Sequence, residues 1–163
     1  MVHAHLWERT EALERTRKIA DYQFGKGAGE ALIPDDAKIT FSRATGRIRH
    51  IYSKRKLLAT LRPTDGMFSL TVNGARCLNR EARFVGMMVE VSKDAAPFIA
   101  KGKSVFAKHI VHASPEIRPR EEAIVQNEDT EVLAVGKAAL TGREMMAFKR
   151  GIAVRVRRGI DEE

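Results

Sequence analysis

Closely spaced turn signals between residues 38 and 72 constrain this chain more than any other feature of its sequence. Four short segments of alternating apolar and polar residues are separated by turns at Thr45–Gly46, Ser53–Arg55 and Pro63–Gly66. Alternation with a period of two indicates strands with one buried face, and turns this close together indicate hairpins. We therefore predict an antiparallel meander of four strands.

A helical segment precedes the predicted meander. Leu6, Leu13, Ala20 and Phe24 mark one apolar stripe of a helix that runs from Leu6 to Phe24. The following loop, GKGAG at residues 25–29, has the glycine content of a phosphate-binding loop. Such a loop requires a strand before it, whereas this one follows a helix. We therefore favour a structural turn.

Residues 87–159 show short strands and short helices in alternation. Their periodicity predicts strands at 87–91, 105–110, 122–127, 131–139 and 152–157, with helices near 93–101 and 141–148. Gly136 inside a strand suggests a bulge or a close approach of another backbone segment. This order suits a small, closed, barrel-like β domain. We predict an α+β fold with two domains, at residues 1–86 and 87–163.

The charge of the chain is strongly positive and unevenly distributed. The net charge is +8 and the sequence pI is near 9.9, an excess that is typical of proteins with a polyanionic partner. Residues 1–88 hold 16 Lys and Arg against 9 Asp and Glu, and no acidic residue lies between Asp36 and Asp65. We expect this interval either to contact phosphates or to be a solvated basic face; its candidate contact residues are Arg43, Arg47, Arg49, Lys54 and Arg55.

A glycine turn near residue 102 is a second candidate site. Ala95, Phe98 and Ile99 recur at helical spacing before Gly102, and an alternating strand pattern follows it. Lysines at 101, 103 and 108 surround the turn. The segment reads either as an ordinary corner between a helix and a strand or as a surface that faces RNA. Phe106 belongs either to the core or to a base-stacking surface.

Motifs for catalysis or metal binding are weak. Gly102-Lys103-Ser104 copies the end of a P-loop, but Pro97 stands where the motif needs glycine. The single cysteine, Cys77, excludes an internal disulfide. The carboxylates of Glu121 and Glu122 are expected to be solvated in a turn. We predict no catalytic residue, no cofactor and no metal, and we expect a soluble cytoplasmic protein that does not bind membranes.

Ordered blocks of the C-terminal part resemble a PUA domain, an RNA-binding module named for pseudouridine synthases and archaeosine transglycosylases. The blocks are APFIAKGKSVFAK, IRPREEAIV, LAVGKA, EMMAFKRG and AVRVRRG, within residues 96–159. The N-terminal part, especially RKIADYQFGKGAGEAL at 17–32, looks like the domain that precedes PUA in archaeal tRNA-guanine transglycosylases. The chain thus resembles the RNA-holding end of those enzymes, without their catalytic barrel.

This resemblance implies RNA binding rather than chemistry. In that enzyme family the PUA domain holds the acceptor stem and the 3′ end of tRNA. Carried onto this sequence, the RNA-facing residues are Lys101, Gly102, Lys103, Ser104, Phe106, Lys108, Arg150, Gly151 and Arg155. One departure is that His109 and Ile110 occupy a region where many PUA domains have glycine.

These observations leave several functions open. The first is a noncatalytic protein that binds tRNA or another structured RNA, and a related version is an accessory subunit of a tRNA-modifying, archaeosine-type transglycosylase. The alternatives are a protein-interaction module of a ribosomal or RNA-processing assembly and a small nucleotide-acting enzyme. That enzyme would use the GKGAG loop or His50. The sequence does not name the RNA.

Overall fold

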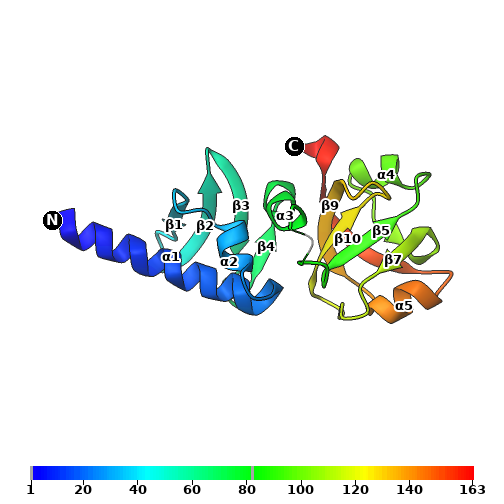
Figure 1. Cartoon of the computed structure of the whole chain (residues 1–163), viewed down its shortest axis with the longest axis horizontal. Helices are drawn as coiled ribbons and strands as arrows, with labels where there is room; N and C mark the ends of the chain where they lie inside the picture. Colours follow the sequence, from blue (N-terminus) through cyan, green and yellow to red (C-terminus); the bar gives the residue numbers. More distant parts are fainter. Residues whose placement is uncertain (1, 82) are drawn as a thin grey trace. The chain divides into compact units, whose positions relative to one another are not determined.

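The chain divides into two compact units, Met1–Leu78 and Asn79–Glu163. The computed structural model describes residues 2–81 and 83–163, and for residues 2–7 it describes the backbone alone. Figure 1 shows both units in sequence colours. Among the helices in these described ranges, none is long and apolar enough to cross a membrane.

The N-terminal unit combines helices with an antiparallel sheet. Its sheet has the strand order β1-β2-β3-β4, and each neighbouring pair is antiparallel, which confirms the predicted meander. The elements are α1 (Val2–Phe24), α2 (Ala28–Leu32), β1 (Lys38–Phe41), β2 (Ile48–Ser53), β3 (Lys56–Leu61), β4 (Phe68–Leu70) and α3 (Val72–Asn79).

Helix α1 is anchored to the rest of its unit along one face. The buried positions of this face recur every four residues, at Ala12, Thr16, Ala20 and Phe24. The Thr16 hydroxyl donates to the carbonyl of Ala12 at 2.8 Å, so its burial leaves no unpaired polar group. The predicted stripe thus holds for Ala20 and Phe24, whereas Leu13 is half-buried and the side chain of Leu6 lies outside the described residues.

The side chain of Gln23 closes the outer edge of β4. Its amide nitrogen donates to the carbonyl of Phe68 at 2.9 Å, and its amide oxygen accepts from the Phe68 amide at 2.7 Å. These two bonds replace a neighbouring strand at an edge that otherwise offers unpaired backbone groups.

The GKGAG loop between α1 and α2 is a structural turn. The carboxylate of Asp21 accepts from the amides of Gly27 and Gly29 at 3.1 and 2.7 Å. A Cβ on Gly29 would lie 2.5 Å from the backbone carbonyl of Arg17. Because a carboxylate of the chain itself already occupies the amide donors, the loop offers no phosphate cradle.

The C-terminal unit is a nearly closed barrel of six strands with short helices, as predicted. Its strand order is β6-β10-β9-β8-β5-β7, and only the β5–β8 pair among these described strands is parallel. The elements are β5 (Met88–Val91), α4 (Ala96–Ala100), β6 (Val105–Phe106), the 3₁₀ turn η1 (Ala107–His109), β7 (Ile110–Ala113), β8 (Glu122–Gln126), β9 (Val132–Ala138), α5 (Gly142–Ala147), β10 (Ile152–Gly159) and η2 (Ile160–Glu162).

The single strand predicted over residues 105–110 is wrong in one respect, because η1 interrupts it. The Ala107 amide donates to the carbonyl of Gly151, beside β10, at 2.9 Å. Two residues later the carbonyl of His109 accepts from Ser92, beside β5, at 2.9 Å. The chain therefore changes its partner strand within three residues. Alternation of side chains does not reveal such a change.

The backbones of β9 and β10 meet closely at Gly136. A Cβ there would lie 2.1 Å from the carbonyl oxygen of Arg155. The register shifts between Val156 and Arg158, so Arg157 is an extra residue in β10. The close approach and the bulge that Gly136 suggested are both present.

The bulge carries a buried ion pair. Both guanidinium NH₂ groups of Arg157 donate to the carboxylate of Glu122, at 3.0 and 2.7 Å. The Glu122 side chain is 1% exposed, so the prediction that this carboxylate is solvated is wrong. A buried charge requires such a partner. Here the partner lies 35 residues away and is invisible to local sequence patterns.

Replacing Gly136 by alanine should destabilise the C-terminal unit. Because the added methyl group meets backbone rather than a movable side chain, we expect a loss of about 2 kcal/mol or more in the free energy of unfolding. Gly151→Ala is the matched control, since nothing lies within 4 Å of its Cβ and its cost comes from its φ of +94° alone, about 1 kcal/mol. Urea unfolding measures both; equal losses would contradict the close approach.

Removing Arg157 should cost more stability than removing its neighbour Arg158. In Arg157→Ala the buried Glu122 carboxylate loses its bidentate partner, and we expect a loss of about 2 kcal/mol because the Arg157 side chain is 35% exposed and partly screened. Exposed Arg158→Ala should change the free energy of unfolding by less than about 0.5 kcal/mol. Thermal unfolding of the two variants decides the point.

Candidate nucleic-acid interface

The corner between α4 and β6 presents three cations. Lys101 caps the C-terminus of α4, and Gly102 then adopts a φ of +91°, the left-handed region in which glycine is favoured. The Lys103 amide donates back to the carbonyl of Phe98 at 3.1 Å, which closes the turn. Lys101, Lys103 and, in η1, Lys108 are all exposed. We call residues 101–108 the glycine corner.

The start of β10 lies directly beside the glycine corner. Ile152 pairs with Phe106 in the sheet, and Gly151 accepts from the Ala107 amide. The exposed Arg150 therefore belongs to the same neighbourhood as the corner, although more than 40 residues separate them in the chain. The structure thus brings together the two segments that the resemblance selected.

Aromatic side chains are exposed on both sides of the glycine turn. Phe106 is 45% exposed, so it is not a core residue and its ring is accessible. Phe98 is 64% exposed, although its helical spacing suggested an apolar face. Exposed aromatic rings beside cations are the usual means of stacking unpaired bases. Sequence reasoning missed Phe98 because it stands one position before the buried Ile99.

Gly102 and Ser104 have internal roles in the barrel. A Cβ on Gly102 would lie 2.6 Å from a carboxylate oxygen of Glu162, and this oxygen also accepts from the Gly159 amide at 2.7 Å. The hydroxyl of Ser104 accepts from the Val156 amide at 3.4 Å. One side of the glycine turn is therefore covered by a carboxylate.

Arg155 has a basic neighbour that sequence reasoning missed. Arg155 on β10 pairs with Lys137 on β9, and both side chains are exposed. Residues directly opposite each other on antiparallel strands share one face, so two positive charges stand side by side. The alternation of buried Gly136 and Ala138 around Lys137 was the available signal.

Four of the five basic residues predicted in the meander lie in turns, where they form two groups. Exposed Arg43 and Arg47 lie in the turn between β1 and β2. Exposed Lys54 and Arg55 lie in the turn between β2 and β3, at the other end of β2. A six-residue strand separates the two turns by about 20 Å.

Arg49 lies between these two groups, on β2. Its Nε donates to the ring of His50 at 3.3 Å, and the other ring nitrogen of His50 lies 3.1 Å from the Thr60 hydroxyl. Both nitrogens of His50 thus have partners.

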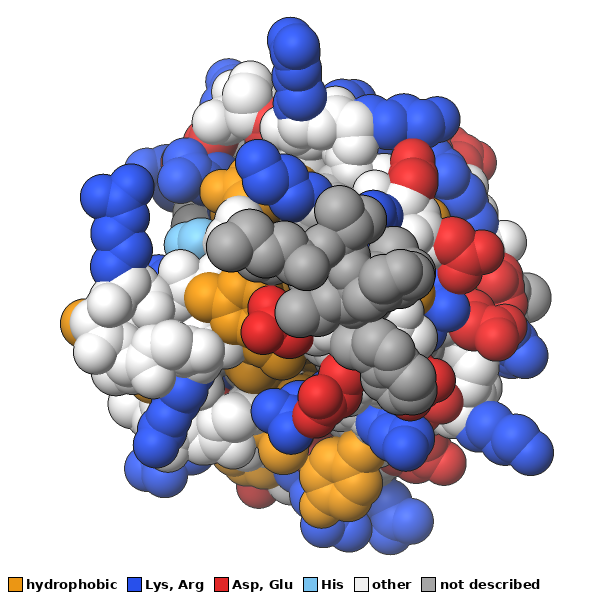
Figure 2. Space-filling model, turned by 90° about the vertical axis from the view of Figure 1, so that its left-hand side faces the viewer, with side chains coloured by type: hydrophobic (Ala, Val, Ile, Leu, Met, Phe, Trp, Pro, Cys, Tyr) orange, Lys and Arg blue, Asp and Glu red, His pale blue; other side chains and the backbone are white. Residues whose placement is uncertain are grey.

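Figure 2 shows Lys and Arg side chains (blue) around the whole border of the face in view, with acidic side chains (red) at its right and near its centre.

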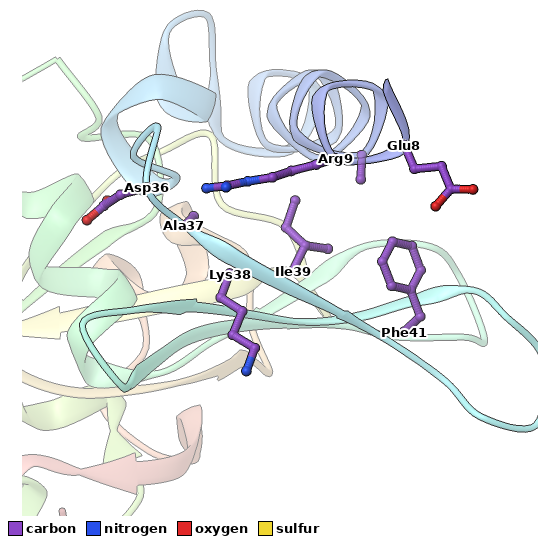
Figure 3. Close-up of a pocket in the computed structure, with 8 residues that line it drawn as sticks. Glu8, Arg9, Asp36, Ala37, Lys38, Ile39 and Phe41 are labelled. Atoms are coloured by element: carbon purple, nitrogen blue, oxygen red, sulfur yellow. The ribbon is translucent and has the colours of Figure 1, made fainter. Parts of the chain in front are cut away.

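A pocket of about 370 Å³ lies between α1 and the edge strand β1. Figure 3 shows Ile39 and Phe41 of β1 beneath the helix, with Arg9 extended from α1 toward Asp36. The remaining lining residues are Glu8, Ala12, Ala37 and Lys38. Among the residues that the structure describes, no group of three His, Cys, Asp or Glu side chains is placed to hold a metal ion.

Each unit matches a known protein family. Residues 14–83 match the patch-forming domain C2 of tRNA-guanine transglycosylase, and residues 87–160 match the PUA domain. Among solved structures, a conserved PUA domain protein from Thermoplasma acidophilum aligns with 95% of this chain and 92% of its own, with a TM-score of 0.68 and 22% identity. A hypothetical protein of Pyrococcus horikoshii aligns with a TM-score of 0.72, 22% identity and coverage of 91% and 90%. At these identities the similarity shows the fold alone.

Two curated relatives are similar along most of the chain. The tRNA-guanine(15) transglycosylase of Methanothermobacter thermautotrophicus is 46% identical over 147 residues, 90% of this chain. That of Thermococcus kodakarensis is 45% identical over 155 residues, 95% of this chain. The chain spans 22% and 26% of their respective lengths. It consists of a tRNA-guanine transglycosylase C2 domain followed by a PUA domain, and it matches the C-terminal portion of archaeal tRNA-guanine(15) transglycosylases.

Proposed function

We propose that this chain is a noncatalytic module that binds tRNA through shape and phosphate contacts. The observation that carries the proposal is the glycine corner, where exposed lysines and Phe106 lie next to the segment that leads from Arg150 into β10. Cations supply sequence-independent attraction to phosphates, and exposed rings stack on unpaired bases. The chain combines both at one corner of a PUA domain.

The tRNA end is the part of the substrate that fits this corner best. An acceptor stem offers duplex phosphates, and its 3′ end offers unpaired bases beside them. Phosphates are bound by cations and unpaired bases by aromatic rings, and the glycine corner presents both kinds of side chain. We assign tRNA contacts to Lys101, Gly102, Lys103, Ser104, Phe106, Lys108, Arg150, Gly151 and Arg155. We also propose that the boundary between the two functional domains lies at residue 86.

The module would serve a tRNA-modifying transglycosylase. No catalytic domain is evident in the chain, which covers about a quarter of the length of its transglycosylase relatives. In this proposal the catalytic part lies elsewhere, in the same polypeptide or in a separate subunit, and the module holds the tRNA for it. The cytoplasm is where we expect it to act.

Binding of tRNA should depend steeply on salt and on the glycine corner. We expect Lys101→Gln/Lys103→Gln to weaken tRNA binding about tenfold and to reduce the slope of log affinity against log salt by about 2, one unit for each lost phosphate contact. Arg118→Gln/Arg143→Gln removes two exposed charges of the same unit outside the corner and should change little. Filter binding at several salt concentrations measures this; weak binding that ignores salt would sink the proposal.

A role in tRNA modification should be visible in cells. Deleting the coding region for residues 1–163 should lower the level of the modified guanine that the transglycosylase installs, because the enzyme loses its hold on tRNA. Mass spectrometry of nucleosides from purified tRNA gives the readout. Restoration by the wild-type chain, but not by Lys101→Gln/Lys103→Gln, would separate tRNA binding from other losses. Unchanged modification would count against the link with the enzyme.

A further inference from the structure

The turn between β2 and β3 has a backbone conformation that other residue types usually adopt. Ser53 and Lys56 pair across the hairpin, so Lys54 and Arg55 form a two-residue loop. Their φ angles are +47° and +68°, and a two-residue hairpin loop with positive φ at both positions has the form of a type I′ turn. Such turns are dominated by Asn-Gly, Asp-Gly and Gly-Gly.

This choice of residues opposes the stability of the hairpin. A side chain with a Cβ is disfavoured in the left-handed region, and two adjacent long cations add repulsion to that strain. Within the described part of the chain, neither side chain has a hydrogen bond or an ion pair that offsets this cost. Strain that persists without internal compensation is a feature of functional positions.

Few carboxylates lie near this turn along the chain. No acidic residue lies between Asp36 and Asp65, and Asp65 accepts two hydrogen bonds from Arg62, at 3.1 and 2.9 Å. Lys56 follows the turn directly, and Lys38 pairs with Tyr52 at the same end of the sheet. Both are exposed. We call the group Lys38, Lys54, Arg55 and Lys56 the hairpin-tip cluster.

The hairpin-tip cluster lies around the tip of a hairpin that projects away from the helix α1. Figure 1 shows the β2–β3 hairpin projecting away from α1, so its tip is free of the helix. The Cα atoms of Lys54 and Arg55 are about 3.8 Å apart, which lets both side chains reach the same stretch of a polyanion. Arg55 can hold one phosphate with two parallel hydrogen bonds, and Lys54 contributes a point charge beside it.

We infer that the β2–β3 hairpin tip is a phosphate-contacting site for the backbone of folded RNA, and that its strained Lys54-Arg55 turn is retained for this contact. The inference rests on the proposed function and deepens it. It separates the tip from Arg43 and Arg47, which lie at the opposite end of the sheet. The contact is to phosphates, so it supplies attraction without sequence preference.

Replacing the turn by Asn-Gly tests both halves of the inference at once. In Lys54→Asn/Arg55→Gly, relief of the strain should raise Tm by about 5 °C. Loss of two phosphate contacts should weaken tRNA binding about tenfold and reduce the salt slope by about 2. A role confined to folding cannot move stability and binding in opposite directions.

Two matched variants complete the experiment. Lys54→Gln/Arg55→Gln keeps the strained backbone and removes only the charge repulsion, so it should lose the same affinity with a smaller rise in Tm than Lys54→Asn/Arg55→Gly. Lys18→Gln/Lys26→Gln removes two exposed charges elsewhere in the same unit and should keep the wild-type salt slope within about 0.5.

The outcomes separate this inference from the proposed function. If the wild type binds tRNA with a steep salt slope and Lys54→Asn/Arg55→Gly binds equally well, the inference falls and the proposed function stands. A lowered Tm in that variant would overturn the claim that strain is retained for binding. A wild-type chain that does not bind tRNA would overturn both.

Discussion

The connection between the two edge strands of the C-terminal sheet determines the rest of that unit. β6 and β7 stand at opposite ends of the strand order, yet only the three residues of η1 join them. The sheet must therefore curl until its edges nearly meet. β6 is itself paired with the start of β10, which places Phe106 beside Ile152. Backbone pairing with β10 and the 3₁₀ turn thus fix the path of the glycine corner.

Glycines and one ion pair make this curvature possible. The backbones of β9 and β10 meet at Gly136, and the extra residue Arg157 lets β10 bend while its charge is matched by Glu122. Near the end of the strand, a Cβ on Gly159 would lie 2.2 Å from the carbonyl of Ala100, so β10 also packs against the end of α4. β10 thus contacts both the barrel strands and the end of α4, where the glycine corner begins.

Local periodicity predicted most of the elements in order, but it missed α2 and the change of partner strand at η1, and it failed where contacts are long-range. The meander, the barrel and the bulge near Gly136 follow from alternation and turn residues. The partner of Glu122 does not, because Arg157 comes near it only through a register shift in β10. Along the sequence, the basic residues of the meander form one interval. Charge along a sequence does not show that Arg43 and Arg47 lie at one end of β2 and Lys54 and Arg55 at the other. Phe106 was ambiguous because alternation at β6 assigns two faces without saying which is buried.

The distribution of charge separates attraction from positioning. Residues 1–88 carry 16 cations against 9 anions, whereas the remainder carries 13 against 12. At the glycine corner the Glu162 carboxylate lies against Gly102 and offsets part of the nearby lysine charge. Solvent-exposed charges are screened beyond a Debye length of about 8 Å, so the larger net charge of residues 1–88 dominates the attraction that reaches that far. Long-range attraction of a polyanion must then come chiefly from the N-terminal unit. In the proposed function the corner acts at contact distance, where the placement of each lysine and each ring would decide which part of the RNA is held.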